Sequence, residues 1–261
     1  MRLITSSHVR VPLGLVLTGG GRRRVDLTVR YGLIEGPDGP WLVDTGYGPR
    51  VTTGPRSLAL RCYAALLRPR LIEAASPLAV LRRDYGWAPE DVRTIIVTHW
   101  HADHVAHLRD FPAARLIACG EGWRQVAAMS GRQAVQHGIF RELLPDDVGE
   151  RLVPLQDFAQ ADSGTGLGRG YDLMGDGRLL AISLPGHAPG HLGLLRRTPQ
   201  GPLLYATDVA WTMQALAEAR TPALAQRVVC HDRVAASRQE ERVRTFMGEG
   251  RVALCHDREE A

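Results

Sequence analysis

Short apolar runs separated by turn residues dominate the chain, and most of them are too short to be helices. Runs rich in Val, Ile and Leu, bounded by Gly, Pro and Asp, are typical of strands, several of them buried. We expect strands at 25–33, 41–43, 94–97, 116–118, 171–173, 179–184, 192–195, 203–206 and 252–254. So many short strands predict a fold built around β-sheets.

Three segments between these runs carry apolar residues at helical spacing. The segment 57–85 repeats Leu and Ala every three or four positions, with two prolines placed to divide it. Similar patterns occur at 123–134 and 235–247. Strands and helices alternate, and no change in composition marks a linker. The pattern predicts one α/β or α+β domain over residues 1–261, with a helical insertion at about 57–85.

Composition narrows the classes of function. The 261 residues include 32 Lys plus Arg and 28 Asp plus Glu, and the net charge of +4 is too small an excess to predict a nucleic-acid partner. No apolar run approaches the ~20 residues that span a membrane. The four cysteines form no CxxC pair, which favours free thiols in a reducing compartment. We therefore expect a cytoplasmic protein that binds neither nucleic acid nor membranes.

One segment concentrates histidine and carboxylate side chains directly after a predicted buried strand. Residues 98–104 read Thr-His-Trp-His-Ala-Asp-His. In an extended loop alternate side chains share a face, so His99 and His101 point the same way and can hold one metal ion. Asp103 and His104 are adjacent, so they diverge and can reach a second ion. Imidazole nitrogen and carboxylate oxygen are zinc ligands, and α/β sites form at strand ends.

This segment matches the H-x-H-x-D-H signature of the metallo-β-lactamase superfamily, and four further segments resemble the superfamily's other motifs in order. They are Leu-Val-Asp-Thr-Gly at 42–46, Pro-Gly-His-Ala-Pro-Gly-His at 185–191, Tyr-Ala-Thr-Asp at 205–208 and Leu-Cys-His-Asp at 254–257. One such motif is a weak signal, whereas five in order are specific. The resemblance implies an αββα sandwich, in which two mixed β-sheets pack face to face and helices flank them.

The resemblance also implies a ligand set for two divalent ions. The first ion takes His99, His101 and His187, the second takes Asp103, His104 and His256, and Asp208 bridges both together with a water or hydroxide. We expect zinc, while manganese, iron and cobalt accept the same ligands. His231 has the same Cys-His-Asp-Arg context as His256, but we prefer His256 because it follows a β-like run.

A dinuclear centre makes chemical sense for hydrolysis. Two ions ~3.5–4 Å apart lower the pKa of a shared water, and the hydroxide attacks a carbonyl polarised by one ion. Asp103 is placed to orient this nucleophile and to pass its proton to the leaving group. We expect Asp44 to hydrogen-bond a metal ligand. A simple turn role for Asp44, two residues before Gly46, is the alternative.

Within the superfamily the chain is most similar to the acyl-homoserine lactonases. It carries Asp208, which true β-lactamases lack, and the phrase at 172–177 resembles theirs. Many lactonases place a Tyr three residues after the bridging Asp, where this chain has Trp211, a substrate-binding candidate with an N–H donor but no hydroxyl. We therefore expect a hydrolase that opens a small-molecule lactone or ester. Relatives are often homodimers, so we expect that state here.

Three other functions stay open. One is a mononuclear iron oxidoreductase similar to the persulfide dioxygenases, and another is a hydrolase of a different thioester or phosphodiester. A third is a non-catalytic module that keeps the metals for stability. The number and identity of the bound ions discriminate the iron enzyme from the dinuclear hydrolase.

The role of the 57–85 insertion is open as well. Its Leu- and Ala-rich pattern fits a lid or acyl-chain pocket, an outer helix, or a dimer face rimmed by Arg61, Arg68 and Arg70. We favour an outer helix or a dimer face over a lid or acyl-chain pocket, because apolar stripes at helical spacing usually serve packing.

Overall fold

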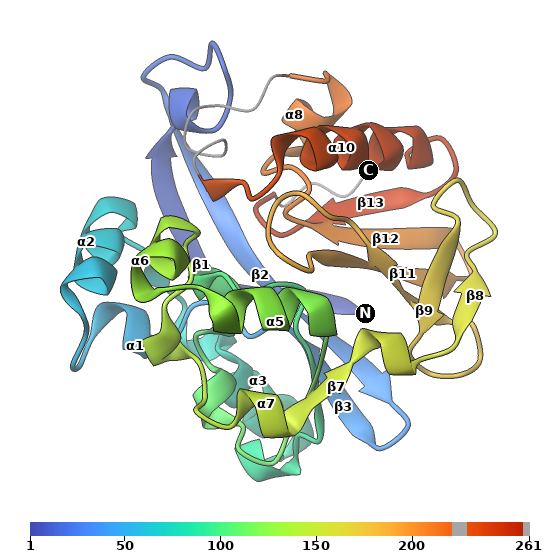
Figure 1. Ribbon diagram of the computed structural model, residues 1–261, viewed down its shortest axis with the longest axis horizontal. Helices are drawn as coiled ribbons and strands as arrows, with labels where there is room; N and C mark the ends of the chain where they lie inside the picture. Colours follow the sequence, from blue (N-terminus) through green and yellow to red (C-terminus); the bar gives the residue numbers. More distant parts are fainter. Residues whose placement is uncertain (221–228, 258–261) are drawn as a thin grey trace.

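A computed structural model describes residues 1–220 and 229–257, and two β-sheets form its centre (Figure 1). Among these residues the first sheet has seven strands in the order β4-β1-β2-β3-β5-β6-β7. They are β1 (Arg2–Pro12), β2 (Arg24–Gly36), β3 (Gly39–Val43), β4 (Arg70–Leu71), β5 (Thr94–Ile96), β6 (Arg115–Ala118) and β7 (Leu152–Pro154). Strands β3, β5, β6 and β7 run parallel, whereas β4, β1, β2 and β3 alternate in direction.

The second sheet has six strands within the described residues, in the order β13-β12-β11-β10-β9-β8. They are β8 (Gln160–Asp162), β9 (Arg169–Asp172), β10 (Leu179–Ser183), β11 (Leu192–Thr198), β12 (Gly201–Thr207) and β13 (Arg251–Leu254). All neighbours are antiparallel except β12 and β13, which are parallel. Both sheets are therefore mixed.

Helices lie on the outer faces of the sheets (Figure 1). They are α1 (Pro49–Thr52), α2 (Leu58–Leu67), α3 (Pro77–Tyr85), α4 (Ala102–Val105), α5 (Gly120–Ala128), α6 (Gly131–Gln136), α7 (Val148–Arg151), α8 (Met213–Ala217) and α10 (Arg233–Phe246). Helix α10 contacts β13, while α5 and α7 contact β7 and β6. In the described part of the chain, no helix is both long and apolar enough to cross a membrane.

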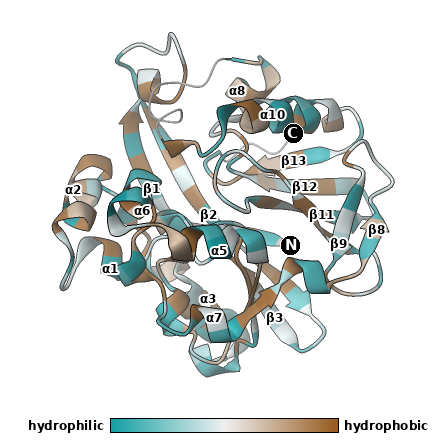
Figure 2. Cartoon of the chain, viewed as in Figure 1, coloured by the Kyte–Doolittle hydropathy of each residue, from teal (hydrophilic) through white to brown (hydrophobic). Residues whose placement is uncertain are grey.

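The central strands of the second sheet are buried on both faces, and the period of two along a strand explains how. In β10, Leu179 and Ala181 belong to the main core that includes the first sheet, whereas Leu180 and Ile182 pack in a second cluster. That second cluster contains residues of α8 and α10, such as Phe246. Figure 2 shows the result as apolar strands inside and polar segments along α5 and α10.

Strand β2 connects the two sheets at the end of β13. The Thr28 amide donates to the carbonyl of His256 (3.2 Å), and the Arg30 guanidinium donates to the carbonyl of Leu254. In the other direction the Tyr205 hydroxyl donates to the carbonyl of Arg30 (3.2 Å). These bonds fix the position of His256 relative to the first sheet.

The predicted fold class, two mixed sheets flanked by helices, is confirmed, and the main omission is β1. Its pairing with β2 shifts register between Thr5 and Ser7, and Ser6 and Ser7 are buried. The shift interrupts the alternation of apolar and polar residues that marks a strand.

The 57–85 segment contains α2 and α3, which begin at the capping residues Ser57 and Ser76. Between them Arg70–Leu71 forms β4, where only helix was predicted, because it pairs with the edge of β1. Helix α2 buries Leu60 in the main core, so its inner face packs on the first sheet's side of the molecule. Leu58 and Leu66 lie on its outer face and are 73% and 76% exposed.

Candidate metal centre

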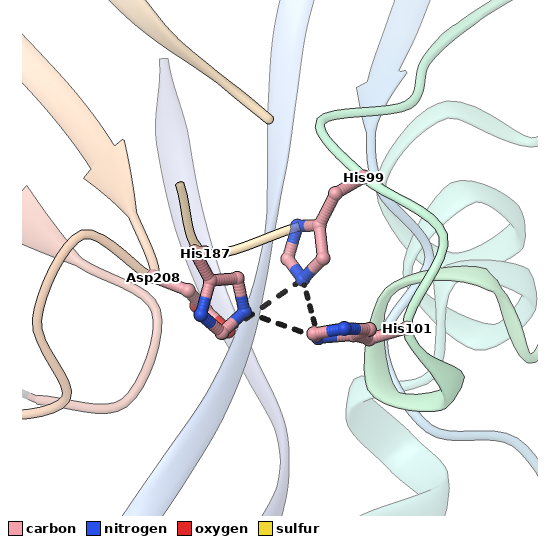
Figure 3. A group of neighbouring side chains, drawn as sticks. All are labelled: His99, His101, His187 and Asp208. Carbon is pink, nitrogen blue, oxygen red and sulfur yellow. Dashed lines mark hydrogen bonds and ion pairs between the residues drawn. The ribbon is translucent and has the colours of Figure 1, made fainter. Parts of the chain in front are cut away.

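Segments that follow four strands meet at one edge of the sheets and carry all the predicted ligands, Asp103 and His104 in the short helix α4 and the others in loops. The predicted ligands are His99, His101, Asp103 and His104 after β5, His187 after β10, Asp208 after β12 and His256 after β13. Every one of these side chains is buried. Figure 3 shows His99, His101, His187 and Asp208 converging from separate segments. Buried polar groups need partners, so this gathering requires a chemical explanation.

Three histidines and one aspartate form the first group of potential ligands. The nitrogen His99 Nε2 lies 3.1 Å from His101 Nδ1, which lies 3.0 Å from His187 Nε2. The carboxylate of Asp208 is 3.4 Å from His187 Nε2 and 3.7 Å from His99 Nε2. One donor atom from each of the four residues lies within 4.8 Å of the others. This spacing fits a single cation among them.

Burial, reinforced by the neighbouring imidazoles, lowers the pKa of His99 and His101 well below the usual histidine value. Both rings are therefore neutral near pH 7, and neutral imidazole is the form that binds a metal. The nitrogen of His101 that faces the other two histidines is Nδ1. The first group thus has neutral imidazole nitrogens close enough together to bind one cation.

The second group lies on the other side of Asp208. Its Oδ2 atom is 3.2 Å from His256 Nε2 and 3.4 Å from His104 Nε2. Asp103 Oδ2 is 3.4 Å from His256 Nε2 and 3.6 Å from His104 Nε2. The thiol of Cys255 also lies within 4.8 Å of the His104, Asp208 and His256 donor atoms. Asp208 is thus shared by both groups.

Carboxylates dominate the electrostatics of the second group. Burial disfavours the charged form of His104, but Asp208, with help from Asp103 and Asp44, raises its pKa well above the usual value. The pKa of His256 is likewise raised to about 10 by Asp208 against the effect of burial. In the described part of the chain, His104 Nε2 and Asp208 Oδ1 are buried without hydrogen-bond partners. Potential metal-ligand atoms that have no hydrogen-bond partner and lie beside negative charge fit a divalent cation.

Hydrogen bonds from behind fix the orientation of two of these rings. His104 Nδ1 contacts Asp44 Oδ2 at 2.8 Å, and His256 Nδ1 contacts the carbonyl oxygen of Thr28 at 2.7 Å. Such contacts hold the ring so that the opposite nitrogen faces the ligand. The residue that Asp44 contacts is therefore His104, one of the predicted ligands.

His191 lies behind the first group, as the third motif implied. Its Nδ1 contacts the carbonyl of Leu184 at 2.8 Å, and its Nε2 contacts the hydroxyl of Thr207. Burial lowers its pKa to about 3, which keeps the ring neutral. With both nitrogens engaged, His191 has no lone pair available for an ion and supports the loops instead.

His231, the rival of His256, stays outside both groups. Its side chain is exposed and lies against the ring of His137 at 5.6 Å, and only its backbone amide reaches the His187 carbonyl. Thr98 and Cys255 also lie at the centre, although neither was predicted to have a role there. Thr98 binds Asp44, and Cys255 lies beside His256 in the second group. Their positions next to His99 and His256 were the available signal.

Trp211 lies beside the second group. Its ring centroid is 6.0 Å from that of His256, and the two rings meet edge to face. The indole Nε1 is buried but has no hydrogen-bond partner among residues 1–220 and 229–257. An N–H donor of this kind is available to a bound molecule.

Comparisons with known proteins agree with this geometry. The chain is similar to gamma-lactamase FDB1 of Fusarium pseudograminearum, with 31% identity over 142 residues that cover 53% of this chain and 34% of FDB1. It is also similar to the N-acyl homoserine lactonase AttM of Rhizobium radiobacter, with 30% identity over 198 residues that cover 76% of this chain and 70% of AttM. The match to FDB1 therefore spans about a third of that relative's length.

Solved structures show the same fold. A mutant of AiiA from B. thuringiensis with bound N-decanoyl-L-homoserine superposes with a TM-score of 0.71, at 18% identity, over 98% of this chain and 92% of that chain. A profile of the metallo-beta-lactamase superfamily matches residues 25–240, which is most of the sequence. With its motifs, its two mixed sheets and this profile match, the chain belongs to the metallo-beta-lactamase superfamily.

Proposed function

We propose that the protein is a dinuclear metal-dependent hydrolase that opens a lactone or ester. The observation that carries this proposal is the position of Asp208. Its carboxylate lies 3.4 Å from His187 Nε2 in the first group and 3.2 Å from His256 Nε2 in the second. A carboxylate shared by two groups of nitrogen donors is suited to bridging two cations.

The proposed ligands divide between two ions. His99, His101 and His187 hold the first, Asp103, His104 and His256 hold the second, and Asp208 holds both. When bound, two divalent ions supply Lewis acidity toward a carbonyl and a bridging water acidic enough to form hydroxide near neutral pH. We propose zinc, because imidazole and carboxylate are its usual ligands, and manganese, iron and cobalt accept the same set.

Asp103 is the proposed proton carrier. Its carboxylate is within 3.6 Å of both imidazoles of the second group, and its side chain is 10% exposed. A carboxylate there can orient the attacking water, take its proton and return it to the leaving oxygen. Trp211 is the proposed substrate contact, because its buried N–H has no other partner.

The relatives supply the substrate class. AttM is an N-acyl homoserine lactonase, and lactone opening requires an activated water, a polarised carbonyl and a protonated leaving oxygen. FDB1 is a gamma-lactamase, so a γ-lactam is a second candidate substrate. The second group of donors beside Asp208 favours the dinuclear hydrolase over the mononuclear iron alternative.

Metal content measured together with turnover tests the proposal. Protein purified without added metal should hold about two divalent ions per chain and hydrolyse γ-decalactone, phenyl acetate or a γ-lactam. His101→Ala should lose metal and turnover, while His231→Ala, which changes an exposed ring outside both groups, should keep both. One iron per chain with oxygen uptake on a persulfide would contradict the proposal. Full metal without turnover on the panel would favour a binding module.

The setting of the enzyme is also a proposal. All four cysteines are free thiols, which supports a reducing compartment such as the cytoplasm. We propose a single domain that assembles as a homodimer, and sedimentation analysis of the full chain measures that state.

A further inference from the structure

Two tyrosines that the proposed function does not use form a hydroxyl pair near the metal centre. Tyr47 lies in the loop after β3, three residues beyond Asp44, and Tyr63 lies on α2 in the 57–85 insertion. Their hydroxyl oxygens are 2.5 Å apart. Tyr47 is 3% exposed, and the two rings are tilted at a centroid distance of 6.4 Å. The contact is half-buried, because Tyr63 is itself only partly covered, and it joins two phenols from distant segments of the chain.

The loop that carries Tyr47 is bound directly to the segment that carries Asp103. The amide and the hydroxyl of Thr45 donate to the carbonyl of His104, at 2.7 Å and 3.0 Å. The amide of His107 donates back to the Thr45 hydroxyl at 3.1 Å. Thr45 is therefore bound to α4 at His104, and Tyr47 follows two residues later in the same loop.

Helix α2 is held so that Tyr63 faces inward. The amide and hydroxyl of Ser57, at the start of the helix, donate to the carboxylate of Glu142. The ring of Tyr63 packs on Phe140 at a centroid distance of 4.9 Å, and Leu60, three positions earlier on the same helix, is fully buried. The Ser57–Glu142 hydrogen bonds and the packing of Tyr63 on Phe140 therefore hold α2 in the position that brings the two hydroxyls together.

One of the two phenolic hydrogens of Tyr47 and Tyr63 is not used in the hydrogen bond between them. Each phenol carries one donor hydrogen, and the bond between them engages one of the two. Within residues 1–220 and 229–257, neither hydroxyl has a second hydrogen-bond partner. Burial raises the pKa of both phenols, and the charge of Asp103 raises it further, so both stay protonated. A neutral O–H donor is thus available within electrostatic range of Asp103.

We propose that the Tyr47–Tyr63 pair is a substrate-binding element that donates its unused hydrogen to an oxygen of the lactone or ester beside Asp103. This inference rests on the proposed function. It gives the insertion a second role, because α2 then contributes a side chain to the substrate as well as an apolar face to the core. The pair supplies a hydroxyl donor, and Trp211 offers only an N–H.

Three variants test the pair: Tyr47→Phe, Tyr63→Phe and the double variant, each assayed on γ-decalactone and phenyl acetate. The single variant that removes the donating phenol should lower kcat/KM about tenfold, mainly through KM, because a hydrogen bond to the bound substrate is lost. The variant that removes its partner should lower kcat/KM less, because the donating hydroxyl stays and loses only the contact that orients it. The double variant should lose no more than about tenfold, because only one of the two phenols donates to the substrate. Metal content should stay at about two ions per chain.

Tyr85→Phe is the matched control, because Tyr85 lies in the same insertion but is 37% exposed. It should keep kcat/KM within about twofold. Variants with unchanged kcat/KM on an active wild-type background would overturn the inference and leave the proposed function intact. Losses that multiply to about a hundredfold in the double variant would also overturn it, because the phenols would then act separately. A wild-type enzyme without turnover on either substrate would overturn both proposals.

Discussion

The carboxylate of Asp44 holds the imidazole of His104 from behind, with Oδ2 at 2.8 Å from Nδ1. The backbone amide and hydroxyl of Thr98 donate to the same carboxylate, at 2.8 Å and 2.7 Å. An ionised carboxylate accepts hydrogen bonds only, so Nδ1 of His104 carries the hydrogen and Nε2 faces Asp208. Asp44, in the segment after β3, thus selects the tautomer of His104, a proposed ligand 60 residues later in the chain.

Asp44→Asn should weaken the second metal position. An amide keeps the shape of the carboxylate and tolerates the left-handed backbone of residue 44 (φ 58°), but it does not enforce the same imidazole tautomer. We expect metal affinity or activity to fall roughly 10–100-fold. Competition with a chelator measures the affinity of each position. Asp157→Asn, at an exposed carboxylate, is the control, and an unchanged affinity in Asp44→Asn would refute the assignment.

Asp208→Asn should impair both metal positions together. The variant removes the one negative charge that lies between the imidazoles of both groups. We expect kcat/KM to fall at least about a hundredfold, because a two-metal centre contributes several kcal/mol of transition-state stabilisation. Elemental analysis should show fewer than two ions per chain. Retention of two tightly held ions would argue against the bridging role.

Trp211→Phe should distinguish the contribution of the N–H donor to substrate binding from that of the aromatic ring. Phe keeps an apolar face beside His256 and removes the buried Nε1–H, which has no protein partner. We expect KM for a lactone to rise about threefold to tenfold, with kcat nearly unchanged, since one neutral hydrogen bond is lost. Steady-state kinetics on γ-decalactone measures both constants. An unchanged KM would remove Trp211 from the substrate contacts.

Glu240 on α10, a residue outside the metal centre, should make the free energy of unfolding depend on pH. Burial raises its pKa from 4.5 to about 7, and nearby Arg244 opposes the shift only in part. The folded chain therefore keeps a proton that the unfolded chain releases, so this contribution is complete below about pH 4.5 and is lost as pH rises through 7. Glu240→Gln should raise Tm over the wild type more at pH 8 than at pH 5, measured by thermal unfolding. An equal difference at both pH values would contradict the assignment.

The sequence by itself determined which residues gather at the candidate metal centre. The spacing of His99 and His101 after an apolar strand, and the order of the segments with His187, Asp208 and His256, are local features. Ligands at strand ends depend on residues that are neighbours in the chain, which motifs record directly. The alternation of strands and helices likewise indicated the two mixed sheets, because a periodicity of two or 3.6 is a local property.

The tertiary structure alone decided which distant side chains touch. Asp44 meets His104, Tyr47 meets Tyr63, and Asp208 lies between two groups drawn from both sheets. Strand β1 was missed because its register shift breaks the alternation, yet it is paired along its length with β2. These contacts follow from the order and register of strands and from how one sheet packs on the other. Local periodicity fixes which face of an element is buried, and only packing selects the partner across that face.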